Sequence, residues 1–201
     1  GEKRFAVIDT EAGRGKHYAD LFKFDHGDLA PPFSPDRYSE AIKAADDAHY
    51  PVMTTEEICK LPVREKADKD CALLMWTTDA HLPDALRVME SWGFEYRTVA
   101  FVWLKKYHTG TPCVLVAPWT LKSTELCLLG IRGSPKRAAT NIRALIEAER
   151  TNHSKKPEQA MERIEALFGD VPRLELFARR KRHGWASWGN EIACDVEMPN
   201  S

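Results

Sequence analysis

The sequence lacks any long apolar stretch. Its apolar runs are short, as at residues 73–76 and 126–129, whereas a helix that crosses a bilayer needs roughly 20 consecutive apolar residues. Residues 1–8 likewise lack the apolar segment and the small-residue cleavage site of a signal peptide. We therefore expect no membrane association and a cytoplasmic protein, or a nuclear one if the source is eukaryotic.

An excess of either charge is also missing. The chain has 29 Lys and Arg against 30 Asp and Glu, so its formal net charge is -1. Bulk charge therefore gives no reason to expect nucleic acid, a membrane surface or an acidic substrate as the ligand. Only local clusters of charge can favour such a ligand.

Metal-binding and disulfide patterns are absent too. The five cysteines include no Cys-x-x-Cys pair, and the seven histidines are scattered. Cys71 and Cys127 lie within apolar runs, where a reduced thiol behaves as a small hydrophobic side chain. We expect neither a disulfide framework nor a metal site.

What the sequence does contain fits one domain. A chain of 201 residues and 22.8 kDa with 43% hydrophobic residues can bury a full core, so we expect a single domain over residues 1–201. The apolar residues 5–8 predict a strand that ends at Asp9. Residues 9–48 are rich in Gly, Pro and charge and predict a long irregular loop, with a short helix at 38–47.

Beyond residue 50, predicted strands alternate with predicted helices. Thr54 and Glu57 have capping-box spacing before a helix that Pro62 ends. Further helices are expected over 82–92 and 157–168, and strands over 71–78, 98–104, 125–131 and 174–178. This alternation predicts an α/β sheet with helices on both faces and ligands at the carboxyl ends of its strands, where Asp9, Thr78-Asp79, Lys105 and Arg179 would face one crevice.

Ordered sequence blocks over about residues 49–191 carry a resemblance to a known family. They are Tyr50-Pro51-Val52-Met53-Thr54-Thr55-Glu56-Glu57-Ile58, Leu74-Met75-Trp76-Thr77-Thr78, Ser91-Trp92-Gly93-Phe94, Phe101-Val102-Trp103-Leu104-Lys105, Glu125-Leu126-Cys127-Leu128-Leu129-Gly130, His153-Ser154-Lys155-Lys156-Pro157, Leu174-Glu175-Leu176-Phe177-Ala178-Arg179 and Trp188-Gly189-Asn190-Glu191. In order and spacing they resemble the adenosine N6-methyltransferases named for the seventy-kilodalton subunit of the messenger-RNA methyltransferase, in a compact bacterial or phage form.

The resemblance implies both a fold and a reaction. The fold is a Rossmann-like S-adenosylmethionine-dependent methyltransferase with permuted motif order and a central, mostly parallel sheet. The reaction is methyl transfer from S-adenosylmethionine to the 6-amino group of adenine in DNA or RNA. The base must be single-stranded or flipped out of a duplex to enter such a pocket.

The family's acceptor motif, Asp-Pro-Pro-Trp after the first strand, is not intact. The carboxylate that accepts a hydrogen bond from the amine is assigned to Asp9, because the chain there reads Asp9-Thr10-Glu11-Ala12. Asp20, within Tyr18-Ala19-Asp20-Leu21-Phe22, is the alternative, and Ala30-Pro31-Pro32-Phe33 keeps the prolines and an aromatic ring without the acid. The degenerate motif leaves a second reading open: a catalytically inactive protein that binds nucleic acid or serves as a partner subunit.

The resemblance assigns the cofactor to the second half of the chain, at Glu175, Arg179, Asn190, Glu191 and Arg132. It also implies a homodimer or a heterodimer with a related subunit. An asparagine amide can bind ribose hydroxyls, and a guanidinium can hold a carboxylate through two parallel bonds.

Local basic clusters give the chain a route to nucleic acid. We expect phosphate contacts from Lys105, Lys106, Arg180, Lys181 and Arg182. Four aromatic side chains are suited to stack on bases, namely Tyr38, Tyr107, His108 and Trp119, whereas Trp76, Trp92 and Trp103 are expected in the core.

Overall fold

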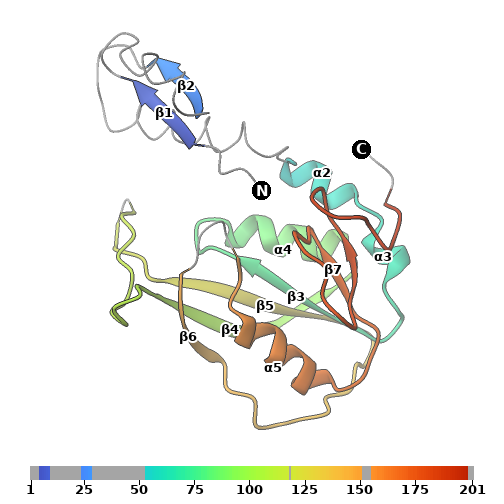
Figure 1. Cartoon of the computed structure of the whole chain (residues 1–201). Coiled ribbons are helices and arrows are strands. Elements are labelled where there is room, and N and C mark those ends of the chain that lie inside the picture. The colour runs from blue at the N-terminus through green and yellow to red at the C-terminus, as the bar shows by residue number, and fades with distance from the viewer. Residues whose placement is uncertain (1–4, 10–23, 29–52, 118, 151–154, 199–201) are drawn as a thin grey trace. The chain divides into compact units, whose positions relative to one another are not determined.

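The computed structural model describes residues 5–9, 24–28, 53–117, 119–150 and 155–198 (Figure 1). Its Cα packing divides the chain into two units, Gly1–Met53 and Thr54–Ser201. The predicted helix at 38–47, Asp20 and the segment 30–33 lie outside the described residues.

The first unit contains two parallel strands, β1 (Phe5–Asp9) and β2 (Phe24–Asp28). β1 confirms the predicted strand, with Asp9 as its last residue. β2 lies within residues 9–48, so the expectation of irregular structure there is wrong at this strand. The sequence does not predict β2 because Phe-Asp-His-Gly-Asp has no alternation of apolar and polar residues. The register aligns Asp9 with Asp28, so both strands end at an aspartate.

The second unit is built on a four-stranded sheet in the order β3-β5-β4-β6. Its strands are β3 (Cys71–Thr77), β4 (Glu95–Lys106), β5 (Thr124–Arg132) and β6 (Leu145–Glu149). β5 is antiparallel to both of its neighbours, and only the β4–β6 pairing is parallel. This sheet is therefore mixed rather than mostly parallel, because the connection from β4 turns back as a hairpin and places β5 between β3 and β4.

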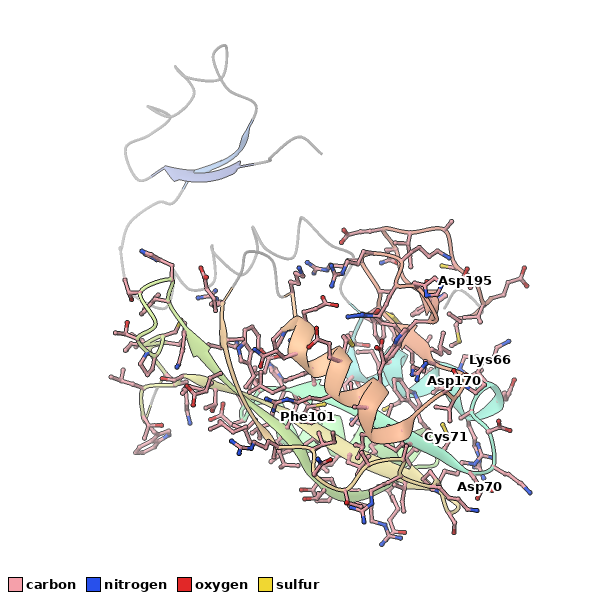
Figure 2. The ribbon with its side chains drawn as sticks, turned by 60° about the horizontal axis from the view of Figure 1, so that its bottom comes forward. Lys66, Asp70, Cys71, Phe101, Asp170 and Asp195 are labelled. Carbon is pink, nitrogen blue, oxygen red and sulfur yellow. The ribbon has the colours of Figure 1, made fainter. Side chains whose placement is uncertain are left out.

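Helices cover both faces of this sheet, as predicted for an α/β fold. α4 (Leu82–Ser91) packs on one face, where a Cβ placed on Gly130 of β5 would meet Met89. α5 (Glu158–Phe168) packs on the other, against a core of Phe101, Cys127 and Ile146 (Figure 2). Residues 127 and 130 of one strand point to opposite faces, which fixes the two helices on opposite sides.

Two short helices precede β3. α2 (Thr55–Lys60) has the predicted capping box: the Thr54 hydroxyl accepts from the Glu57 amide, and the Glu57 carboxylate accepts from the Thr54 amide. α3 (Val63–Lys66) follows the proline that ends α2. The Trp92 indole donates to the Ile58 carbonyl over 2.9 Å and so ties α2 to the end of α4.

The tryptophans and Cys127 behave as the sequence predicts. Trp92 and Trp103 are buried, and Trp76 packs edge-on against Trp103 with 6.5 Å between ring centroids. Burial raises the pKa of the Cys127 thiol to about 12, so this residue acts as a neutral core side chain. Among the described residues, no helix combines the length and apolarity that a membrane crossing requires.

A parallel pair of short strands, β7 (Leu174–Leu176) and β8 (Ala186–Trp188), completes the second unit. The backbone is close-packed just after it, because the Ala178 amide donates to the Trp188 carbonyl over 2.9 Å. Gly189 then passes so near that a Cβ there would lie 2.1 Å from the Ala178 carbonyl oxygen. Arg179 and Asn190 thus lie in the segments that follow the two strands.

Candidate functional site

A buried carboxylate lies between two lysines at one edge of the four-stranded sheet. β3 and β4 run in the same direction and end at Thr77 and Lys106, and β5 begins beside them at Thr124. At this edge the Glu125 Oε2 lies 2.7 Å from the Lys105 Nζ, and the Lys156 Nζ contacts Oε1. The Glu125 side chain is only 8% exposed, so this lysine–glutamate–lysine triad is largely removed from water.

The triad rests on the two core tryptophans. The Lys105 Nζ lies 5.1 Å from the Trp103 ring centroid, and the Lys156 Nζ lies 5.5 Å from the Trp76 ring centroid. Such cation–π contacts hold an ammonium group where it has lost part of its water. Burial acts to raise the Glu125 pKa, but the two ammonium groups outweigh it, so the pKa lies below its ordinary value.

The triad has one anionic and two cationic groups, and ligands in open α/β sheets bind outside the carboxyl ends of strands. It therefore presents a fixed, net positive site at the edge where such ligands lie. Thr78 and Asp79, which follow β3, belong to this same edge, as the sequence predicts for them and for Lys105. The Asp79 carboxylate pairs with Lys122, and this ion pair lowers its pKa.

A second group of polar residues gathers where β7 and β8 end. The two parallel strands place residues 177–179 beside 189–191, and the Arg179 Nε lies 3.5 Å from the Glu191 Oε1. Asn190, between Gly189 and Glu191, is exposed. Three of the five predicted cofactor residues are thereby brought to one strand end.

Glu175 lies on β7 itself, one residue before the strand end. Its carboxylate is half-buried, and this burial raises its pKa against the weaker opposing charge of Arg180. The neighbouring Phe177 adopts a positive φ of 58°, which side chains rarely do, and its ring lies 5.4 Å from that of Trp188. Strained backbone of this kind is often kept near ligand sites.

Arg132 is the predicted cofactor residue with a clear packing role. It is the last residue of β5 and pairs in register with Cys71, the first residue of β3. Its guanidinium donates to the carbonyl of Arg64 over 2.7 Å and to that of Ala67 over 3.4 Å. Arg132 thus fastens the segment around α3 to the sheet.

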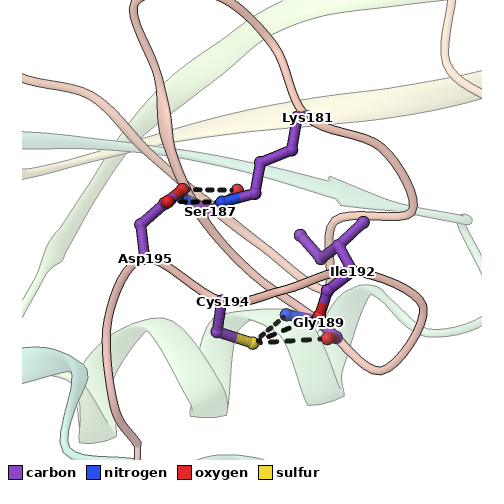
Figure 3. A network of polar contacts seen from close by, with 6 residues as sticks. All are labelled: Lys181, Ser187, Gly189, Ile192, Cys194 and Asp195. Atoms are coloured by element: carbon purple, nitrogen blue, oxygen red, sulfur yellow. Dashed lines mark hydrogen bonds and ion pairs between the residues drawn. The ribbon is translucent and has the colours of Figure 1, made fainter.

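The predicted phosphate-binding residues all have carboxylate partners within the chain. Arg180 and Arg182 pair with Glu158 at the start of α5, and Lys106 pairs with Glu147 of β6. Lys181 pairs with Asp195, whose carboxylate also accepts from the Ser187 amide and hydroxyl (Figure 3). Phosphate contacts from these residues stay a prediction, and each contact would have to compete with an existing ion pair.

The sequence predicts no metal site, which would need a cluster of His, Cys, Asp or Glu side chains. Over the residues that the structure describes, no group of three or more such side chains is placed to hold an ion. Cys194, in Figure 3, contacts the backbone of Gly189 and Ile192. The cysteines in the described part of the chain are all free thiols.

Comparison with protein families identifies the chain. The model of the MT-A70 family matches residues 29–191, which is most of the sequence. The chain belongs to the MT-A70 family. This confirms the resemblance, and with it the Rossmann-like methyltransferase class of the α/β fold.

Individual relatives agree with that assignment. The type II methyltransferase M.MunI of Mycoplasma sp is 38% identical over 153 residues, which is 75% of this chain and 63% of that protein. The N6-methyladenosine RNA methyltransferase MTA1 of Cryphonectria parasitica is 31% identical over 148 residues, or 68% of this chain and 42% of that one. An MT-A70-like N(6)-adenosine-methyltransferase of Arabidopsis thaliana is 28% identical over 151 residues, 71% of this chain and 21% of that protein. The chain thus spans less than two thirds of the length of each of these relatives.

In this MT-A70 protein the acceptor carboxylate stays a prediction. Asp9 ends β1, which is the strand position predicted for it, and Asp28 ends the parallel strand beside it. The family match begins at residue 29 and so includes neither Asp9 nor Asp20. Asp20 itself lies outside the described residues.

Sequence reasoning missed two members of the triad, Glu125 and Lys156. It assigned Lys105 to phosphate and treated Glu125 only as the start of an apolar strand. The available signal was an acidic residue directly before the apolar run 126–129, since a buried carboxylate needs a cationic partner. Lys156 could not be matched to it from spacing, because the partners come together only in the folded sheet.

Proposed function

We propose that this protein transfers a methyl group from S-adenosylmethionine to the 6-amino group of adenine in DNA or RNA. Membership of the MT-A70 family supports the proposal, as do the adenine and adenosine N6-methyltransferases among its relatives. The structural observation that carries it is the meeting of Arg179, Asn190 and Glu191 at one strand end.

The residues present fit the cofactor. S-adenosylmethionine supplies an electrophilic methyl group on a sulfonium, together with a ribose and an amino-acid moiety to be held. The exposed Asn190 amide and the half-buried Glu175 carboxylate have the donor and acceptor atoms that ribose hydroxyls need. The Arg179 guanidinium suits the carboxylate of the amino-acid moiety, for which Glu191 is the present partner.

The acceptor side requires a positioned carboxylate. The adenine amine is a weak nucleophile because its lone pair is delocalised into the ring, so the enzyme must orient it and accept a hydrogen bond from it. We assign this role to Asp9, with Asp20 as the alternative. If methyl transfer survives in Asp9→Asn and is lost in Asp20→Asn, the assignment moves to Asp20.

Calorimetric titration with S-adenosylmethionine tests the cofactor site. We expect Asn190→Ala to weaken binding about 2- to 10-fold, the value of one hydrogen bond of ordinary strength. Tyr96→Ala is the matched control, since Tyr96 is an exposed residue of β4 that pairs with Gly130 near the other end of β5. A wild-type chain with no measurable affinity for the cofactor would instead support the inactive, partner-subunit reading.

A further inference from the structure

The connection between β4 and β5, which the structure describes at residues 107–117 and 119–123, forms an arm that extends beyond the ends of the two strands (Figure 1). Leu115 and Lys122 exchange backbone hydrogen bonds of 2.9 and 2.8 Å across it. At its base the buried Cys113 donates its amide to the Lys105 carbonyl, and the Ser123 hydroxyl donates to the Cys113 carbonyl over 2.6 Å. The base of the arm is therefore fixed to the sheet.

The outer part of the arm is apolar and exposed. Trp119 is 96% exposed and Val116 is 90% exposed. Five of the nine large hydrophobic side chains that are exposed in the described part of the chain belong to the arm, namely Tyr107, Val114, Val116, Trp119 and Leu121. Exposed apolar side chains gathered in this way mark an interaction site.

The charge of the arm points to the kind of partner. Residues 107–123 contain no aspartate or glutamate, although 30 of the 201 residues are acidic. Two lysines flank the arm at its base, Lys122 within it and Lys106 directly before it, and they pair with Asp79 and Glu147 respectively. A polyanion therefore meets no carboxylate of the arm itself, and its phosphates would compete with Asp79 and Glu147 for the two lysines.

We infer that the arm binds single-stranded nucleic acid, with the Trp119 indole stacked on a base and the cations at its base contacting phosphates. The inference rests on the proposed function and names how its substrate is held. An indole face accepts any base, and the arm starts one residue after Lys106, at the sheet edge that carries the triad. A surface that binds another protein would also have exposed apolar side chains. It would not require that the arm lack carboxylates, whereas binding of a polyanion favours their absence.

Fluorescence anisotropy with a labelled single-stranded DNA of more than ~16 nucleotides, the upper site size of a single-strand-binding OB fold, tests the inference. We expect Trp119→Ala in the full chain to weaken binding about 5- to 100-fold, and Trp119→Leu to do the same, because neither variant has a ring to stack. Trp119→Phe should retain most of the affinity. Tyr96→Ala is again the control and should leave the affinity unchanged.

The side chain of Trp119 is almost wholly exposed, so these variants should fold, and unaltered binding of S-adenosylmethionine will verify it. Equal affinity of wild type and Trp119→Ala would overturn the inference. It would also be overturned if Trp119→Ala left DNA binding intact but dissociated a dimer in sedimentation, since the arm would then bind a second copy. Trp119-dependent binding without methyl transfer would uphold the inference while removing the proposed reaction.

Discussion

At the scale of single residues, Glu125 is a buried carboxylate that balances the charges of two lysines. Its side chain is 8% exposed and carries the contacts of both Lys105 and Lys156. A buried ion pair is a weak source of net stability, but removing one partner leaves the others without compensation. Removing any one member of the triad is thus expected to destabilise the fold.

We expect Glu125→Gln to lower the free energy of unfolding by about 3 kcal/mol, because two poorly hydrated ammonium groups lose their counter-charge. Urea denaturation followed by tryptophan fluorescence measures the change. Glu147→Gln is the control: it removes the partner of Lys106 at a carboxylate that is 48% exposed and should cost about 1 kcal/mol or less. Similar losses of stability in both variants would show that the triad contributes no more than the exposed pair of Lys106 and Glu147.

Lowering the pH should protonate Glu125 and so remove its contribution to stability. The folded-state pKa of Glu125 lies below its ordinary value of 4.5, so its stabilising contribution is complete above that value. The contribution is lost as the pH falls through the lowered pKa, when the folded carboxylate takes up its proton. The difference in stability between wild type and Glu125→Gln should therefore shrink as the pH falls below about 4.5.

At the scale of elements, the contact between Gly189 and Ala178 holds the end of β8 against the chain that leaves β7. A methyl group on Gly189 would collide with backbone atoms, which cannot move aside as a side chain can. This close approach sets the position of the Asn190 amide relative to Arg179. The geometry of the second polar group thus depends on a residue with no side chain.

Gly189→Ala should lower stability by about 1–3 kcal/mol and weaken S-adenosylmethionine binding, because overpacking displaces the strand end. Gly130→Ala is the matched control. Its methyl group would meet chiefly the flexible Met89 side chain, which leaves room for repacking, so cofactor binding should persist. Thermal unfolding and calorimetry report the two effects; full cofactor affinity in Gly189→Ala would contradict the assignment.

The elements also show where sequence reasoning succeeds and where it stops. Strands such as β3 and β5 are continuous apolar runs, and α4 has apolar residues at helical spacing with Gly93 after it, so burial itself marks them. β6 carries two glutamates in five residues and β8 has only three residues, so neither has a pattern to find. The direction of β5 follows from a hairpin connection that the sequence does not distinguish from a crossover.

The site residues likewise include some that the sequence predicts and some that it does not. Lys105 and Glu125 are separated by the whole arm, and only the antiparallel register of β4 and β5 makes them neighbours. Arg179 and Glu191, in contrast, were chosen by resemblance, and the parallel pair β7–β8 brings them together. Family motifs thus identified residues whose meeting no local pattern could have predicted.

At the scale of the whole molecule, a chain with nearly balanced charge separates its groups by place. Acidic residues of α5 hold the basic run that follows β7, whereas the arm has no acidic residue. The near-neutral total therefore conceals an uneven distribution of charge along the chain. This arrangement suits a protein that must admit a polyanionic substrate beside a charged small-molecule cofactor.

The most direct measurement of the proposed reaction is mass spectrometry of nucleosides after incubation of the chain with adenine-containing DNA or RNA and methyl-deuterated S-adenosylmethionine. We predict adenine nucleosides that carry the deuterated methyl group on N6. Labelling of another atom, or no labelled nucleoside from either nucleic acid although the chain is folded and binds the cofactor, would contradict the account.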